Sequence, residues 1–220
     1  MKHETGRENG RLRFVIVEHR TKVIVSHVSN WVTGQSGHWA SEIQYIEYVA
    51  PANSCPQCGF EWGAVTAQEI PDRLRRATDS FSAVIRDAKK QANERPSPER
   101  WSILEYGAHL RDVLISIRER IIAASVQDSP TGAAIYRDER VSLGFYKLDD
   151  ASHVAHELDA MASLFVRTFI CLPSGYEERT FVYSPVTPNE VTILWAAAQA
   201  LHECEHHLDD VRENLDLLNT

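Results

Sequence analysis

The sequence predicts a mainly α-helical protein with a small β-rich segment ahead of the helices. Four stretches of about twenty residues repeat their apolar side chains at the spacing of an amphipathic helix, and short breaks rich in Pro, Gly and Ser separate them. The 220 residues are 43% hydrophobic and 25% charged, which allows one domain with a sizeable core. We divide the chain into an N-terminal extension (1–53), a cysteine-containing turn (54–65) and a helical bundle (66–220).

The N-terminal extension differs from the rest because it is dense in β-branched residues. The segment from Arg13 to Val28 is typical of two strands of a hairpin, interrupted by polar residues at 18–22. An isolated hairpin is only marginally stable in water, so we expect it to pack on another surface or to be poorly ordered. Its histidines lack the spacing of metal ligands and predict no chemistry.

A C-x-x-C pair, Cys55 and Cys58, lies in the turn SCPQCGFEW. Two cysteines three positions apart on a Pro/Gly turn can present both sulfurs to one metal ion. The sequence holds no second C-x-x-C to complete a zinc ribbon, so half a metal site completed by other groups, a redox pair and a plain turn stay open. Cys171 and Cys204 stand singly in helical surroundings and are expected to be reduced, buried thiols.

The first two long helices are predicted from start signals and apolar stripes. The T-x-x-E pattern at Thr66–Glu69 is typical of a capping box, and a proline then opens a helix over about 71–93. After the break ERPSPER, Ser97 is the expected N-cap and Pro98 the first helical residue of the second helix, which covers about 101–125.

A turn-rich connection from about 127 to 150 follows, and connections of this length often cover a site. The third helix is expected at about 151–171, with Asp149 or Asp150 as its cap. A short β segment comes next, and a second T-x-x-E box at 187–190 is expected to cap the last helix.

The last helix, over 194–218, carries the most informative side chains. His202 and His206 are four positions apart, so they project from one face and can reach a single metal ion. His207 points away from that pair, toward neighbouring carboxylates, and we expect it to be solvated or to orient a ligand. A zinc-like site takes at least three protein ligands, so a third must come from elsewhere. The alternative is an amphipathic surface helix that happens to contain histidines.

A third ligand is available on the second helix. His109 lies at the border of that helix's apolar stripe, from which a side chain can point into the interior of a bundle. Asp112 lies near it in direction and can hold its ring in place. The alternative is a half-buried histidine bonded to Asp112 or to a backbone carbonyl. His153 and His156 lie in the exposed first turn of the third helix and are expected on the surface.

Charge and hydropathy exclude several classes of protein. The formal net charge of −8 and the pI near 5.7 argue against a nucleic-acid-binding surface, which needs clustered Lys and Arg. The longest apolar runs fall far short of a membrane span, and the polar opening lacks a secretory pattern. We therefore expect a cytoplasmic protein that binds neither nucleic acid nor membrane.

Three motifs resemble the DinB-like superfamily, which includes the N-terminal domains of mycothiol-dependent maleylpyruvate isomerases. They are WSILEYGAHLRDVL around His109, QALHECEHHLDDV around His202 and His206, and the short cysteine motif CPQCGF. The resemblance covers about 55–218, and the ending around the two last-helix histidines is similar to that of actinobacterial members. It implies a four-helix bundle of up-down-down-up arrangement in which His109, His202 and His206 hold a divalent metal.

The residue patterns and the resemblance agree on these three histidines. One imidazole from the second helix and a pair from the last helix leave at least one coordination position open, as in catalytic metal sites. Zinc and nickel both suit such a set. A homodimer is compatible with the sequence, because bundles with exposed apolar flanks often pair.

The predicted function is that of a divalent-metal-dependent thiol S-transferase or isomerase. The metal would activate a low-molecular-weight thiol such as mycothiol, which would attack a small electrophilic substrate. Asp112 and Glu203 are the candidates for orienting ligands or handling protons. The alternative is a non-catalytic metal-binding or ligand-binding bundle with a structural or stress-related role.

Overall fold

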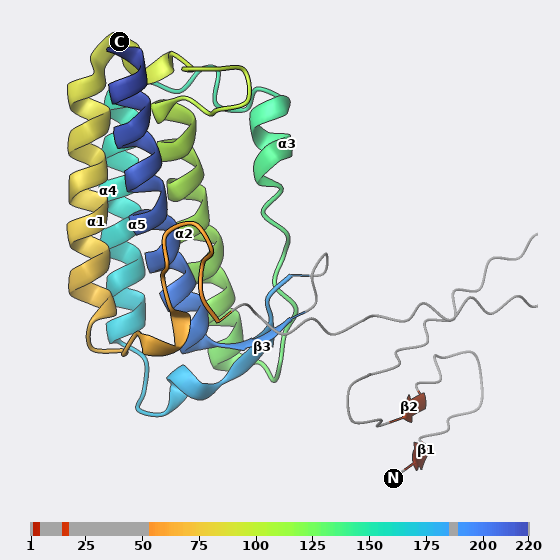
Figure 1. Cartoon of the computed structure of the whole chain (residues 1–220). Coiled ribbons are helices and arrows are strands. Elements are labelled where there is room, and N and C mark those ends of the chain that lie inside the picture. The colour runs from red at the N-terminus through yellow and green to blue at the C-terminus, as the bar shows by residue number, and fades with distance from the viewer. Residues whose placement is uncertain (1, 5–14, 18–52, 185–188, 220) are drawn as a thin grey trace, which may run out of the picture.

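A computed structural model describes residues 2–4, 15–17, 53–184 and 189–219. Its main elements are four long helices: α1 (Ile70–Ala88), α2 (Ile103–Val126), α4 (Ala151–Ile170) and α5 (Ile193–Leu218). Figure 1 shows α1 and α5 running in one direction and α2 and α4 in the other, which is the up-down-down-up arrangement. The predicted four-helix bundle is confirmed.

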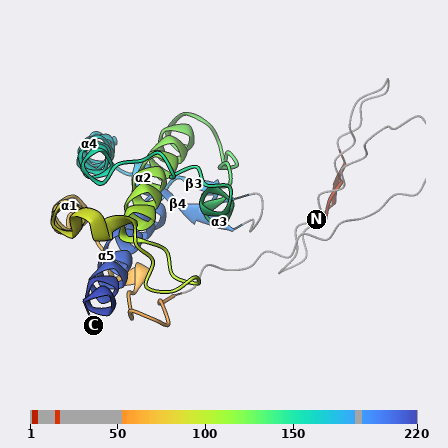
Figure 2. The same ribbon diagram turned by 90° about the horizontal axis from the view of Figure 1, so that it is seen from above.

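The packing of the helices brings α2 beside α5. Helices α1 and α2 each pack mainly on α4 and α5, as the view along the bundle shows (Figure 2). Side chains on the facing surfaces of α2 and α5 can therefore meet, although the two helices are far apart in the sequence.

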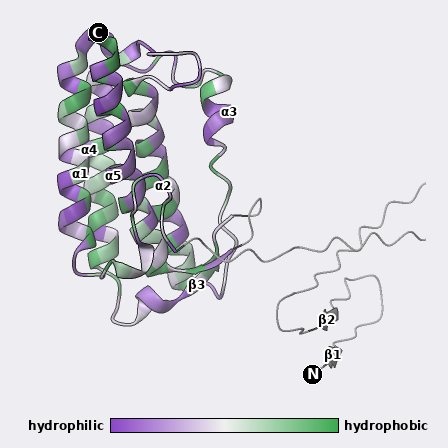
Figure 3. Cartoon of the chain, viewed as in Figure 1, coloured by the Kyte–Doolittle hydropathy of each residue, from purple (hydrophilic) through white to green (hydrophobic). Residues whose placement is uncertain are grey.

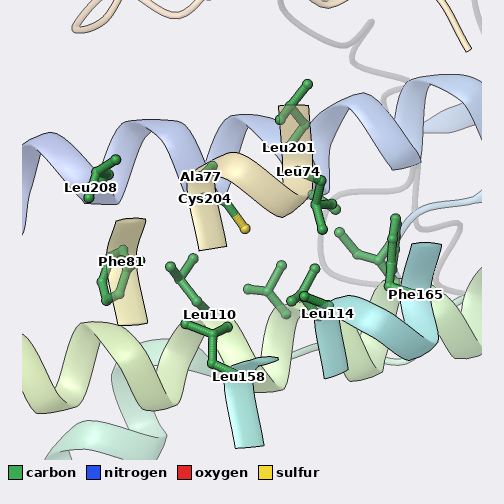
Figure 4. Packing of buried hydrophobic residues seen from close by; sticks show 14 of the residues in the cluster. Leu74, Ala77, Phe81, Leu110, Leu114, Leu158, Phe165, Leu201, Cys204 and Leu208 are labelled. Atoms are coloured by element: carbon green, nitrogen blue, oxygen red, sulfur yellow. The ribbon is translucent and has the colours of Figure 1, made fainter. Parts of the chain in front are cut away.

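One apolar cluster fills the interior of the bundle. Each long helix carries both hydrophobic and hydrophilic residues along its length (Figure 3), as an amphipathic helix must. Fully burying a large apolar side chain contributes about 1.5–3 kcal/mol, so the loss of a few such contributions would be comparable to the net stability of a typical domain. Among the largest fully buried side chains in Figure 4 are Phe81, Leu110, Leu114, Leu158 and Phe165.

Side-chain caps fix where three of the helices begin. Ser102 accepts a hydrogen bond from the Glu105 N–H, and the Glu105 carboxylate accepts one from the Ser102 N–H, which makes a capping box at the start of α2. The prediction of this cap at Ser97 was wrong, because Ser102 and Glu105 form the S-x-x-E pattern of the cap closer to the first buried turn. Asp150 caps α4 as predicted, and Thr192 caps α5.

Short elements join the long helices. They are η1 (Trp62–Ala64), η2 (Lys89–Asn93), α3 (Arg137–Ser142), η3 (Tyr176–Glu178), β3 (Thr180–Val182) and β4 (Glu190–Thr192). Strands β3 and β4 pair antiparallel, with Phe181 opposite Val191. The capping box predicted at 187–190 was wrong, because Glu190 opens β4; residues 185–188 lie outside the described residues.

The N-terminal extension is described only in part. Strand β1 (Lys2–Glu4) pairs antiparallel with β2 (Val15–Val17), so the described partner of β2 is an earlier segment rather than the expected later one. The rest of the hairpin predicted between Arg13 and Val28 lies outside the described residues. Among the described residues, no helix combines the length and apolar character needed to cross a membrane.

Two predictions about isolated polar residues can be compared with the structure. His153 and His156 are exposed, as predicted. Cys204 is a buried free thiol, as predicted, but Cys171 is exposed. The prediction for Cys171 was wrong because this residue lies past the last turn of α4, where the helix has left the core.

Candidate metal centre

Helix α5 presents a core face flanked by two polar faces. Leu201, Cys204 and Leu208 lie on the core face (Figure 4). A helix turns by about 100° per residue, so residues four apart share a face and adjacent residues do not. Two pairs of polar residues at this spacing flank the core stripe, and each pair meets a different part of the chain.

The first pair, His202 and His206, meets the cysteine turn. Ligand atoms of Cys55, Cys58, His202 and His206 all lie within 4.8 Å of one another, and we call these residues the Cys–His cluster. Cys55 Sγ lies 4.0 Å from His206 Nδ1. Figure 1 shows the turn as the orange loop folded over the bundle beside α5. Of the interpretations open for the C-x-x-C, the geometry favours half a metal site completed by other groups.

Backbone hydrogen bonds shape the cysteine turn. The Cys55 N–H donates to the Phe60 carbonyl at 2.8 Å, and the Gly59 N–H donates to the Cys55 carbonyl at 2.9 Å. Gly59 has a φ of 73°, in the left-handed region that glycine adopts without strain. Burial raises the pKa of the Cys55 thiol, but the N–H groups of Cys58 and Gln57 outweigh it and lower that pKa. The turn therefore favours the thiolate of Cys55, which is the form that binds metal ions, whereas burial raises the pKa of Cys58.

His202 has the surroundings of a metal ligand. The residue is 8% exposed, and within the described structure neither of its ring nitrogens has a hydrogen-bond partner. Phe60 and Trp62 lie against the ring, with centroids 5.1 Å and 4.8 Å away. Burial lowers the pKa of His202, which favours the neutral, metal-binding imidazole. Leaving both nitrogens unpaired is costly, and an ion at the cluster would engage one of them.

The second pair, Glu203 and His207, meets α2. His109 Nε2 lies 3.3 Å from Glu203 Oε2, and His207 Nε2 lies 3.2 Å from the same oxygen. We call these three residues the His–Glu–His cluster. Two ligand atoms that are each about 2.1 Å from one zinc ion stand about 3.4 Å apart at the tetrahedral angle. The two imidazoles and the carboxylate are thus spaced as ligands of one ion would be.

Neighbouring groups hold the outer atoms of the His–Glu–His cluster. His207 Nδ1 lies 2.6 Å from Asp210 Oδ2. Gln199 Nε2 donates to Glu203 Oε1 at 2.6 Å, and Gln199 Oε1 accepts from Trp62 Nε1 at 2.7 Å. Such outer hydrogen bonds fix the tautomer of a ligating histidine and the orientation of a ligating carboxylate. The inner atoms are left facing one another.

The electrostatics of the His–Glu–His cluster are those of one carboxylate between two imidazoles. Burial raises the pKa of Glu203, but hydrogen bonds with His109 and His207 dominate and hold that pKa well below its ordinary value. Burial lowers the pKa of His207, but hydrogen bonds with Asp210 and Glu203 raise it to about 9. At neutral pH the ion-free cluster therefore holds a carboxylate and a protonated imidazole, and metal binding would displace that proton.

The three histidines predicted as joint ligands do not lie together. His202 and His206 belong to the Cys–His cluster, whereas His109 belongs to the His–Glu–His cluster. The reason is that α2 faces the neighbouring pair on α5, one residue further along the helix. Glu203 was expected to orient a ligand, but it offers a ligand atom itself. His207 was expected to be solvated or to orient a ligand, but it is 8% exposed and belongs to the same cluster.

Asp112, the other predicted orienting group, serves a different part of the molecule. Its carboxylate accepts hydrogen bonds from Arg140 Nη1 at 2.5 Å, Tyr146 Oη at 2.9 Å and Arg111 Nε at 3.0 Å. Arg140 and Tyr146 come from the connection between α2 and α4. Asp112 therefore fastens this connection to α2, and the assignment of Asp112 as a partner of His109 is corrected.

Comparison with known proteins identifies related families and folds. A model of the DinB superfamily matches residues 66–211. Among solved structures, the chain is similar to YfiT from Bacillus subtilis, described as a probable metal-dependent hydrolase with an unusual four-helix bundle topology. The TM-score is 0.64 at 16% sequence identity, and the match covers 79% of this chain and 95% of YfiT. No curated protein matches the chain. At this identity the likeness to YfiT establishes the fold.

Proposed function

This chain belongs to the DinB superfamily, and we propose that it is a divalent-metal-dependent enzyme that acts on a small molecule at the His–Glu–His cluster. One observation carries the proposal: His109 Nε2 and His207 Nε2 converge on Glu203 Oε2 at 3.3 Å and 3.2 Å. Two histidines and one glutamate are a common ligand set of catalytic zinc sites, and three protein ligands leave a coordination position open.

The residues around the cluster prepare it for that use. A metal at such a site supplies a Lewis acid, which polarises a substrate oxygen or lowers the pKa of a coordinated water or thiol. Asp210 holds Nδ1 of His207 and so directs its Nε2 into the cluster. Gln199 likewise donates to Oε1 of Glu203 and so directs Oε2 into the cluster.

Aromatic rings pack against the two histidines of the His–Glu–His cluster. Trp101 lies against His109, with ring centroids 5.3 Å apart, and Tyr106 lies against His207 at 5.0 Å. His109 itself is 2% exposed. Rings in these positions lower the local dielectric around the inner atoms, which strengthens the electrostatic interactions among them.

The nucleophile that we propose is a low-molecular-weight thiol such as mycothiol, acting on a small electrophile in an S-transfer or isomerisation. This choice rests on the sequence motifs around His109 and around His202 and His206, which resemble those of the mycothiol-dependent members of the superfamily. Water is the competing nucleophile, because YfiT is described as a probable hydrolase. A non-catalytic metal-binding role is the second candidate function, and it is favoured by the presence of the Cys–His cluster, whose four protein ligands would leave no open position.

Metal content and turnover together test the proposal. The protein would be purified without chelator or histidine tag, as wild type, His109→Ala and the control His153→Ala, whose histidine is exposed. We expect His109→Ala to lose about one equivalent of zinc or nickel and the control to lose none. Circular dichroism would verify that both variants fold.

Turnover would then be measured with a thiol and an electrophile, and separately with ester and amide substrates in water. Thiol-dependent product formed by the wild type and not by His109→Ala supports the thiol proposal. If only the hydrolysis of esters or amides is observed, the nucleophile is water and not a thiol. Full metal content in His109→Ala would contradict the proposed centre.

A further inference from the structure

We propose that the Cys–His cluster is a second, structural metal site, which binds a zinc-type ion through Cys55, Cys58, His202 and His206. The four ligand atoms lie within 4.8 Å of one another, and they come from two segments that are remote in the sequence. This site is separate from the His–Glu–His cluster because the two clusters have no ligand in common.

The chemistry of the four side chains points to zinc. Two thiolates and two imidazoles form the Cys₂His₂ set of structural zinc sites, and the spacings C-x₂-C and H-x₃-H are those that such sites use. Soft thiolate ligands disfavour magnesium and calcium, which take oxygen ligands. Four protein ligands complete a tetrahedron, so the site would be closed and structural.

The surroundings of His202 are the second observation that points to an ion. Both of its ring nitrogens are buried and lack a partner within the described structure, and two aromatic rings, Phe60 and Trp62, cover it. A redox pair formed by Cys55 and Cys58 would need no imidazole, and both cysteines are free thiols in the structure. The ion accounts for the unpaired imidazole, whereas a disulfide does not.

The outer partner of His206 also suits a metal ligand. His206 Nδ1 faces Cys55 Sγ at 4.0 Å, while its Nε2 lies 3.8 Å from Asp210 Oδ2. A ligating histidine commonly has a carboxylate near its other ring nitrogen. Asp210 thus stands beside one histidine of each cluster, because His207 Nδ1 lies 2.6 Å from the same oxygen.

The proposed ion would fasten the cysteine turn to α5 and thereby position the neighbouring cluster. Trp62 follows the turn, and its Nε1 donates to Gln199, which in turn donates to Glu203. The cysteine turn is therefore linked to the carboxylate of the His–Glu–His cluster through Trp62 and Gln199. This last step rests on the proposed function, whereas the existence of the structural site does not.

Cobalt substitution distinguishes the two sites, because only the Cys–His cluster contains sulfur. Metal-free protein would be loaded with Co²⁺ as wild type, Cys58→Ser and the control Cys171→Ser, which alters an exposed thiol elsewhere. We expect about two equivalents of Co²⁺ and a strong thiolate-to-cobalt absorption in the wild type and the control. Cys58→Ser should lose that absorption and about one equivalent.

A second variant separates this proposal from the proposed function. Glu203→Gln should lose the other equivalent and keep the thiolate-to-cobalt absorption. If the absorption is present but no substrate is turned over, the structural site stands and the proposed function fails. If wild type shows no thiolate-to-cobalt absorption, or Cys58→Ser retains both equivalents, the structural site is overturned.

X-ray absorption on the zinc-loaded wild type gives the same answer without any variant. Averaged over the two zinc ions, about one sulfur neighbour per zinc is expected at about 2.3 Å, and a shell of nitrogen and oxygen alone would contradict the site. Cys58→His, which keeps four ligands, should retain both equivalents with a weaker thiolate absorption. Loss of the ion in Cys58→Ser combined with its retention in Cys58→His identifies residue 58 as a ligand rather than a folding determinant.

Discussion

The two clusters use α5 in the same way but differ in what completes them. Each takes two residues four positions apart, and the pairs are offset by one residue. The Cys–His cluster is completed by two cysteines of a turn that precedes the bundle, whereas the His–Glu–His cluster is completed by one histidine of α2. The difference teaches that the partner segment, and not the helical spacing, decides whether such a pair forms a closed or an open site.

The largest expected effect comes from the open cluster. Glu203→Gln keeps the shape of the side chain but removes the charge that His109 and His207 share. We expect kcat/KM to fall at least about 10³-fold, equivalent to about 4 kcal/mol of transition-state stabilisation. Steady-state kinetics would measure it, with Cys58→Ser as the comparison. If kcat/KM falls equally in the two variants, the assignment of one open and one closed site is contradicted.

Metal removal should have the next largest effect, this time through the closed cluster. An ion present at about 1,000 times its Kd stabilises the fold by about 4 kcal/mol. For a chain of this size, chelation should therefore lower Tm by about 10 °C. Differential scanning calorimetry with and without chelator would measure the shift. It should be much smaller in Cys58→Ser than in Glu203→Gln; the reverse order would assign the structural ion to the other cluster.

Asp210 offers a way to sharpen the comparison, because it lies beside one histidine of each cluster. Its carboxylate is 2.6 Å from His207 Nδ1 but 3.8 Å from His206 Nε2. Loss of an outer partner costs about 10–100-fold in metal affinity or activity. Asp210→Asn should therefore weaken the His–Glu–His ion by that factor and leave the thiolate-to-cobalt absorption nearly unchanged. Titration of each site with Co²⁺ would separate the two effects.

The smallest expected effect is on the stability that Glu105 contributes at the start of α2, the helix that carries His109. Burial raises the pKa of Glu105, but Arg95 and the Ser102 N–H outweigh it and lower that pKa. The carboxylate therefore stabilises the fold above its unfolded pKa of about 4.3, and this stability is lost as pH falls through the lower folded value.

Glu105→Gln should accordingly cost about 1 kcal/mol at neutral pH and almost nothing once Glu105 is protonated in the folded protein. Urea denaturation at neutral and at acidic pH would measure the difference. Glu119→Gln is the control, because the Glu119 side chain is 61% exposed and its ion-pair partner among the described residues is its neighbour Arg118. A cost for Glu105→Gln that persists in acid would point to packing rather than charge.

Local patterns in the sequence were sufficient for the helices. The cap at Asp150 and the core stripe of α2 depend only on residues within a few turns, and these predictions are confirmed. The cap of α2 was misplaced at Ser97 because the proline after it was taken as the start signal, although Ser102 and Glu105 carry the local capping-box pattern. Secondary structure within the bundle is thus largely a local matter.

The site could be predicted only in part, because its contacts are not local. Helical spacing identified His202 and His206 as a pair, but the pair Glu203 and His207 has the same spacing. Which of the two faces α2 depends on how α5 is rotated in the bundle. The spacing of polar and apolar residues along α5 does not determine that rotation.

The partners of the two pairs were equally hidden in the sequence. Trp62 and Gln199 were missed because their hydrogen bond joins two segments that are remote in the chain. Asp112 was misassigned because Arg140 and Tyr146 reach it from a connection without a regular pattern. In each case the decisive contact is one that packing creates.

The distance along the chain between the cysteine turn and α5 sets an order of events during synthesis. Cys58 leaves the ribosome before all four long helices, and His206 belongs to the last of them. At about 5–20 residues per second, roughly seven to thirty seconds pass between the two. A nascent chain therefore carries bare thiols until α5 emerges, and a chain interrupted before α5 can assemble neither centre. Metal loading at either centre would therefore require that α5 has been synthesised.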